Sequence, residues 1–234
     1  VDKDPCMRLN AFFTAEEAGR LIHDPSILPD RRVAYVLAFL TGMRLGEIAG
    51  LRWCNVDLDM QPLGAIDVVE TYDGRPTKTR TARKVPIVPQ LGEILEAWFA
   101  SGFERIFGRP PTPDDLVVPR PPYGRGPAGT SHSKNSLGKA FTKDLARLGL
   151  RHRRFHDARR TFISLALSSG AQRDVVERVT HTSRPRPSAF DAYITFDWPV
   201  VCREISKLVL PNPFAATNAT SDEATVEPAG RGGP

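Results

Sequence analysis

The fold is decided around one stretch of sequence, TGMRLGEI, at residues 41–48. Its first glycine, Gly42, interrupts an apolar helical pattern that begins at Pro29, and a new short helix is expected to follow directly. The break places Arg44 at the start of that helix, where free backbone amides and a guanidinium point the same way, as in a phosphate-binding site. The alternative is a surface arginine with Glu47 as its i+3 helix partner, which is the more common situation for such a pair taken alone.

On both sides of this stretch, apolar residues recur mainly at the spacing of α-helices. A capping box at Thr14–Glu17 opens one helix that ends near His23. Between Asp57 and Pro89, β-branched residues on either side of an Asp-Gly turn predict a small antiparallel sheet. The fold class is therefore mainly α with a small antiparallel β-sheet (α+β). The predicted helices are 14–23, 29–41, 45–51, 90–100, 134–148, 156–169, 172–180 and 198–208.

The domain organisation follows from composition. Residues 1–210 are predicted to form one domain, since 234 residues suffice for one good core. Within it, residues 102–129 are rich in proline and glycine and are predicted to be an irregular surface loop. Residues 211–234 have few large apolar groups and are predicted to be a disordered tail.

The bulk composition limits the function only loosely. A formal net charge of +5 suits a polyanionic partner such as DNA, although many basic proteins bind none. Three cysteines without metal-ligand spacing predict neither a disulfide framework nor a zinc site. No long apolar run or signal peptide is apparent, so we expect a cytoplasmic protein without a membrane partner.

A second informative block is HDARRTF at residues 156–162. Spacing of three places His156 and Arg159 on one helix face, where a proton-transfer group would lie beside an oxyanion clamp, as phosphoryl transfer requires. The alternative is a solvated basic face that contacts only nucleic-acid backbone. Three further residues, Lys78, His181 and Tyr193, are unremarkable when each is taken alone.

Taken together and in order, these blocks resemble the catalytic domain of the tyrosine recombinase (phage integrase) family over about residues 8 to 208. The resemblance implies an integrase-type DNA breaking and rejoining domain. Thr180 stands before His181, where the family usually has glycine. The helical core-binding domain that normally precedes the catalytic domain is expected to be absent. The implied catalytic residues are Arg44, Lys78, His156, Arg159, His181 and Tyr193, with Glu47 in support.

The resemblance also implies a mechanism. Tyr193 would attack a DNA phosphate to give a 3′-phosphotyrosine and a free 5′-hydroxyl, without metal or nucleotide cofactor. Arg44 and Arg159 would hold the non-bridging oxygens, and Lys78 would protonate the leaving oxygen.

The remaining polar residues would assist this reaction. His156 would help to remove the tyrosine proton or hold the phosphate, His181 would donate a hydrogen bond to the phosphate, and Glu47 would orient an arginine or a histidine. The implied partners are double-stranded DNA and three further copies of the chain in a homotetramer, with no small-molecule substrate. Basic side chains predicted to contact DNA are Arg80, Arg83, Arg153, Arg154 and Arg160.

Under this resemblance the chain would integrate or excise a mobile element. Two alternatives stay open. The same catalytic residues would serve a type IB topoisomerase or a telomere resolvase, which a supercoil relaxation assay would separate from a recombinase. A non-catalytic DNA-binding module would show salt-dependent binding without a covalent adduct.

Overall fold

The computed structural model describes residues 11–71, 82–124, 126–132, 135–181 and 195–215. Most of the described chain is helical, and the helices follow the predicted apolar periodicity. The long ones are α2 (Ala15–His23), α3 (Pro29–Thr41), α5 (Pro89–Ala97), α7 (Ser136–Arg147), α8 (His156–Ser168), α9 (Arg173–Thr180) and α10 (Trp198–Ile205). The short ones are α4 (Leu45–Gly50), the 3₁₀ turn η1 (Trp53–Asn55), the π-helical turn η2 (Trp98–Gly102) and α6 (Phe103–Phe107).

A three-stranded antiparallel sheet lies between α4 and α5 in the sequence. Its strands, in the order β1-β2-β3, are β1 (Val56–Asp57), β2 (Gly64–Val68) and β3 (Arg83–Ile87). Ile66 of β2 lies opposite Val56 on one side and Val85 on the other. Ile66 and Val85 are fully buried and Val56 is partly buried against the core, which confirms the predicted fold class of helices with a small antiparallel sheet.

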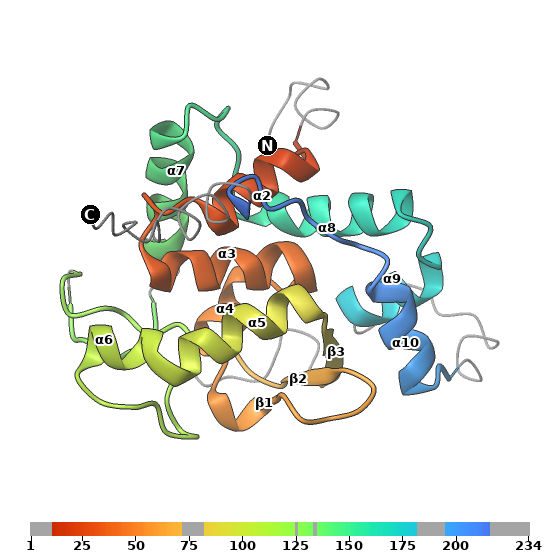
Figure 1. The fold of residues 1–234 in the computed structure, drawn as a ribbon, viewed down its shortest axis with the longest axis horizontal. Helices are drawn as coiled ribbons and strands as arrows, with labels where there is room; N and C mark the ends of the chain where they lie inside the picture. The colour runs from red at the N-terminus through yellow and green to blue at the C-terminus, as the bar shows by residue number, and fades with distance from the viewer. Residues whose placement is uncertain (1–10, 72–81, 125, 133–134, 182–194, 216–234) are drawn as a thin grey trace, which may run out of the picture.

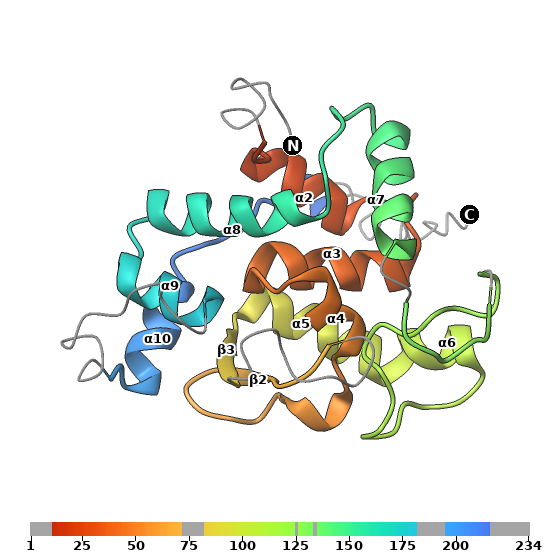
Figure 2. The same cartoon turned by 180° about the vertical axis from the view of Figure 1, so that it is seen from behind.

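Helix α3 occupies the centre of the fold. Every residue from Val33 to Thr41 is buried, so this helix has no solvent-facing side over its last nine residues. Figures 1 and 2 show α3 between α2 and α8 on one side and α4 and α5 on the other. Edge-to-face aromatic contacts join neighbouring segments to α3. The ring centroids of Phe39 and Phe13 are 5.2 Å apart, and those of Tyr35 and Phe141 are 5.1 Å apart. Phe13 precedes α2 and Phe141 lies in α7, so both segments are fastened to α3, and α4 and α8 also pack against this helix.

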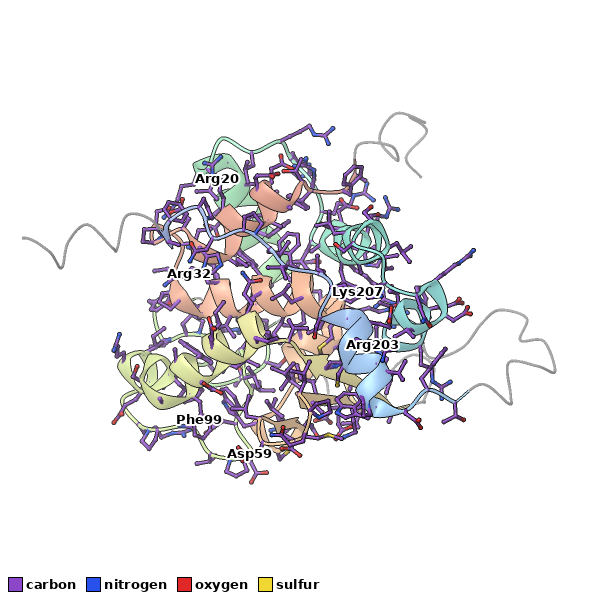
Figure 3. All side chains as sticks on the ribbon, turned by 45° about the vertical axis from the view of Figure 1, so that its right-hand side comes forward. Arg20, Arg32, Asp59, Phe99, Arg203 and Lys207 are labelled. Atoms are coloured by element: carbon purple, nitrogen blue, oxygen red, sulfur yellow. The ribbon has the colours of Figure 1, made fainter. Side chains whose placement is uncertain are left out.

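Helices α9 and α10 pack together at the end of the sheet, against β3 (Figure 1). The carboxylate of Glu204 in α10 accepts the backbone N–H of Gln172 at the start of α9, at 2.9 Å. Lys207, seen just beyond α10 in Figure 3, donates to Glu204 at 2.6 Å and to the carbonyl of Gly170 at 2.9 Å. The two helices therefore form one unit beside the strand that carries Arg83.

The chain after α10 returns across the domain. The side-chain amide of Gln90 donates to the carbonyl of Leu210 at 2.7 Å and accepts the Leu210 N–H at 3.2 Å. Pro211 passes so close to Gly19 that a Cβ on the glycine would lie 2.1 Å from the proline carbonyl oxygen. The start of the predicted tail is thus packed on the domain, and residues 216–234 lie outside the described part of the chain.

One loop prediction was wrong in part. The segment that begins in α5 continues through η2 into α6, which ends at Phe107, inside the region 102–129 predicted to be irregular. The rings of Phe103 and Phe107 lie 4.5 Å apart, and burial of Phe103 supports a helical turn that proline and glycine counts do not reveal. Gly108, at φ +71°, then ends the helix in the left-handed conformation that favours glycine.

No described helix combines the length and the apolar character needed to cross a membrane.

Candidate active site

The junction of α3 and α4 positions the first candidate residue. Gly42 caps α3 at φ +62°, and a Cβ there would lie 2.6 Å from the ring of Phe162 in α8. Arg44 follows as the N-cap residue of α4, with an extended backbone. The chain therefore turns sharply against α8 and brings Arg44 near the helix that carries His156 and Arg159.

Glu47 is the buried anion of the site. Its side chain is 2% exposed, and its two oxygens accept the Arg44 guanidinium at 2.9 Å and the Arg44 backbone N–H at 2.8 Å. Arg83 donates to the same carboxylate with both terminal nitrogens, at 3.0 and 2.6 Å. Burial alone would raise the pKa of Glu47, but the hydrogen bonds and charge of Arg83 outweigh it, and the pKa is lowered. Glu47 is therefore ionised and holds the Arg44 guanidinium; that it orients an arginine or a histidine for catalysis stays a prediction from the family resemblance.

Two arginines predicted to contact DNA are internal instead. Arg83 is 8% exposed, and its Nε donates to the carbonyl of Val179 at 2.7 Å. Arg153 is 7% exposed, and its terminal nitrogen lies 2.8 and 3.1 Å from the two carboxylate oxygens of Glu17. Its guanidinium carbon lies 4.3 Å from the centroid of the Phe13 ring, in a cation–π contact. Burial and pairing assign both guanidiniums to the scaffold rather than to a DNA-facing surface.

Arg159 lies at the centre of the site, in the second turn of α8. Its side chain donates to the backbone carbonyls of Gly42 and Thr180, so it joins the end of α3 to the end of α9. The residue is 4% exposed. Burial, together with the nearby charge of Arg44, lowers its pKa to about 10, which leaves it protonated at neutral pH. Toward the described part of the chain it uses two of its five N–H groups, which leaves three for a further acceptor.

Two histidines border this cation. His156 begins α8, and burial together with the charge of Arg159 lowers its pKa. His181 is the C-cap residue of α9, and its Nδ1 lies 2.9 Å from the hydroxyl oxygen of Thr180. Burial and the charges of Arg159 and Arg44 likewise lower the pKa of His181. At neutral pH both rings are therefore neutral and able to exchange protons.

His181 also borders an open hollow of about 260 Å³. The hollow lies between β3, α9 and the start of α10, and its walls include Lys84, Arg178 and Trp198. A reacting group can therefore approach this histidine from the side of the sheet.

The charge balance of the cluster is strongly positive. Arg159 experiences Arg44 and Arg83 as like charges and Glu47 as an opposite charge. Among the described residues, these three guanidiniums and one carboxylate leave an excess of two positive charges, at a site where Arg83, Arg159 and Glu47 are buried and Arg44 is partly exposed. Buried charge without a partner is costly, so this arrangement favours a bound anion. A tetrahedral phosphate with two charged oxygens fits planar guanidinium donors.

Some candidates lie on the surface or outside the described residues. Arg154 and Arg160 are exposed, and Arg160 lies 3.5 Å from Asp157. Lys78, Arg80 and Tyr193 fall in segments outside the described residues. Within the described ranges no three His, Cys, Asp or Glu side chains come together as a metal-binding group.

The role of Arg83 was missed, although the sequence held a signal for it. Arg83, Val85 and Ile87 alternate along one strand and therefore share a face, and both apolar members are buried. The two carbonyls that hold Arg159 carried no sequence signal at all.

Comparisons with known proteins agree with this geometry. Residues 11–184 match the family model described as Phage integrase family. ICEBs1 integrase from Bacillus subtilis (strain 168) is 29% identical over 96 residues, which cover 37% of this chain and 25% of that protein.

Solved structures show the same fold. The integrase from mycobacterium phage Brujita superposes with a TM-score of 0.57 at 16% identity, covering 84% of this chain and 56% of that one. XerH site-specific recombinase bound to difH substrate gives a TM-score of 0.54 at 15% identity, covering 92% and 55%. The chain thus spans a quarter of the curated relative and little more than half of each solved protein.

Proposed function

Because the chain belongs to the phage integrase family, we propose that it is the catalytic domain of a tyrosine-type site-specific DNA recombinase. It would cleave and rejoin DNA through a 3′-phosphotyrosine and so integrate or excise a mobile element. The observation that carries the proposal is the cluster in which Arg44 and Arg83 pair with the carboxylate of Glu47, while Arg159 lies near enough to be influenced electrostatically by all three. Such a cluster stabilises a phosphate whose negative charge grows in the transition state.

The cleavage step divides among residues of this chain. Arg44 and Arg159 would bind the non-bridging oxygens, because both lie beside Glu47 and Arg159 keeps N–H groups for a further acceptor. The oxygen of Tyr193 would form the new bond to phosphorus while the bond to the 5′-oxygen breaks. Lys78 would give its proton to that leaving oxygen, and a neutral histidine would take the proton of the tyrosine.

The DNA partner follows from the same chemistry. Arg154 and Arg160 lie exposed at the end of α8 that carries His156 and would neutralise backbone phosphates near the scissile one. Exchange between two duplexes requires four such sites, so we propose that four copies assemble on DNA.

A nicked suicide substrate tests the proposal, because loss of a short 5′-fragment traps any covalent complex. The protein is incubated with a pool of long nicked duplexes in the presence of a chelator, and a denaturing gel reveals adducts. We expect an adduct with the wild type and with Tyr123→Phe, a control at an exposed tyrosine, and none with Tyr193→Phe.

Other outcomes separate the alternatives. Salt-dependent DNA binding without any adduct would support a binding module and overturn the proposal. An adduct together with relaxation of supercoiled plasmid, but without joining of two duplexes, would indicate a topoisomerase.

A further inference from the structure

Arg153 lies in the segment that leads into α8, and its side chain is 6% exposed. Its guanidinium is held between the carboxylate of Glu17 in α2 and the ring of Phe13, just before that helix. A planar guanidinium can pair with a carboxylate and stack on an aromatic face at the same time. Arg153 therefore fastens the approach to α8 to α2, which lies beside it in Figures 1 and 2.

A second connection joins the same two elements on the other side of His156. The backbone N–H of Phe13 donates to the buried hydroxyl oxygen of Thr161 in α8 at 2.8 Å. That hydroxyl in turn donates to the carbonyl of Asp157, one helical turn earlier, also at 2.8 Å. Arg153 before His156 and Thr161 after it are thus both tied to the chain that enters α2.

Side chains on the approach to α8 alternate between the interior and the surface. Arg153 and Phe155 are buried, whereas Arg154 and His156 are exposed. The ring centroids of Phe155 and Phe141, a residue of α7, are 5.3 Å apart. With two inward side chains held in this way, the backbone that leads to His156 has little freedom, and the direction of this histidine is fixed.

We propose that Arg153 is a positioning residue: by tying the approach to α8 to α2, it holds His156 beside Arg159 at the site where the scissile phosphate binds. This inference rests on the proposed recombinase function. It replaces the DNA contact that the sequence predicted for Arg153, since a guanidinium enclosed by Glu17 and Phe13 acts through the backbone of α8. Without this tie His156 would be displaced from the reacting phosphate, and rates fall steeply when a catalytic group is misplaced.

The environment of His156 gives a readout of its position that needs no DNA. Burial and the charges of three arginines lower the pKa of its ring, and Asp157 opposes them. The described charged groups that face the ring are Arg159, Arg160 and Asp157 on α8 and Arg44 at the start of α4. A displaced ring would gain solvent and move away from these arginines, so its pKa would rise.

Nitrogen NMR of the labelled, folded chain measures that pKa, and His156→Gln identifies the ring signal among the five histidines. We expect the pKa to rise both in Arg153→Met and in Glu17→Gln. A direct effect of charge would shift it in opposite directions, because one change removes a cation and the other removes an anion. Opposite shifts, or no shift in Arg153→Met, would overturn the inference and leave the recombinase function intact.

Thr14→Ala is the matched control for loss of helix capping, because Glu17 also caps α2. The Thr14 hydroxyl accepts the Glu17 N–H at 3.2 Å, and its removal leaves the pair of Arg153 and Glu17 in place. The pKa of His156 should then stay as in the wild type, and a rise equal to that of Arg153→Met would overturn the role of Arg153. Arg153→Lys keeps a charge near Glu17 without the planar fork, so it should shift the pKa less than Arg153→Met.

Single-turnover cleavage of the suicide substrate tests the consequence for the reaction. We expect Arg153→Met to cleave about tenfold more slowly at saturating DNA, with the half-saturating DNA concentration unchanged and most of the rate restored in Arg153→Lys. Weaker DNA binding at an unchanged maximal rate would show that Arg153 contacts DNA and would overturn the inference. If the wild type formed no adduct, the recombinase function would be refuted, and the NMR titration alone would decide whether Arg153 positions His156.

Discussion

Arg83 holds Glu47 through both terminal guanidinium nitrogens, at 3.0 and 2.6 Å, while its Nε donates to the carbonyl of Val179 at 2.7 Å. One side chain of β3 thus joins the carboxylate that orients Arg44 to the turn of α9 that ends at His181. Both members of the pair are nearly inaccessible, with side-chain exposures of 5% and 2%. The contribution of this pair to stability therefore depends on both charges, because removal of one would leave the other buried with less compensation.

Replacement of the arginine should expose that dependence. Among the described residues, Arg83→Met leaves Glu47 paired with the partly exposed Arg44 alone, and we expect a loss of about 3–5 kcal/mol in the free energy of unfolding. Denaturant titration measures it. The matched control is Arg109→Met. Arg109 donates two hydrogen bonds of 2.6 Å to the carboxylate of Asp115, but its side chain is 52% exposed. That change should cost about 1 kcal/mol or less. Equal losses for the two variants would show that burial does not strengthen the Arg83 pair.

The positive excess around Arg159 should make the protein sensitive to small anions. Sulfate imitates a phosphate, and at about ten times its dissociation constant it should stabilise the fold by about 1.4 kcal/mol. Thermal unfolding in sulfate and in chloride at equal ionic strength separates specific binding from screening. Arg44→Gln should abolish the difference, whereas Arg105→Gln, an exposed arginine on α6, should keep it. If Arg44→Gln responds as strongly as the wild type, sulfate binds somewhere else.

A buried histidine outside the site should dominate the response of stability to acid. His132 is 7% exposed, and burial together with the charge of Arg120 lowers its pKa to about 4. Its unfolded pKa is higher, so the unfolded state binds the proton first, and stability is lost as pH falls from about 6.5 toward about 4. The expected loss at about pH 4 is about 3 kcal/mol.

His132→Gln isolates this contribution. Glutamine has no proton to gain in this range, so the variant should lose about 3 kcal/mol less than the wild type between about pH 7 and about pH 4. Denaturant titrations at both pH values give the difference. Parallel losses in the two proteins would show that other groups set the acid limit.

The sequence predicted the helices and strands of this protein better than it predicted the side-chain contacts between them. Helices α3 and α8 were predictable because their apolar residues recur at helical spacing, and α3 is buried along that pattern. Arg83 was predicted to contact DNA, although it alternates with the apolar Val85 and so shares the buried face of the strand. A side chain's partner depends on the packing of distant segments, and Glu47 is 36 residues away.

The anchoring of Arg159 lay beyond sequence reasoning for a related reason. Its guanidinium binds a backbone carbonyl 117 positions away, at Gly42, and carbonyls carry no residue-specific signature. The helical spacing of His156 and Arg159 gave their shared face, and only the tertiary fold shows what that face meets.

Gly42 illustrates how one small residue serves both the fold and the site, and its replacement is the most direct test of the α3–α4 junction. An alanine at φ +62° is strained, and its Cβ would lie 2.6 Å from the ring of the fully buried Phe162. We expect Gly42→Ala to cost about 1 kcal/mol from the backbone and about 1–3 kcal/mol from overpacking. Equilibrium unfolding of the variant measures the sum.

A second substitution separates the two contributions. Phe162→Leu removes ring atoms from the place where the new methyl group would clash, so Gly42→Ala should cost less in that background than in the wild type. The remaining cost reports the left-handed backbone, which leucine at 162 cannot relieve. If the cost is the same in both backgrounds, the ring of Phe162 moves aside freely, and the junction is held by backbone conformation alone. Since the Gly42 carbonyl accepts Arg159, any shift of the junction should also slow cleavage of the suicide substrate in the Gly42→Ala variant.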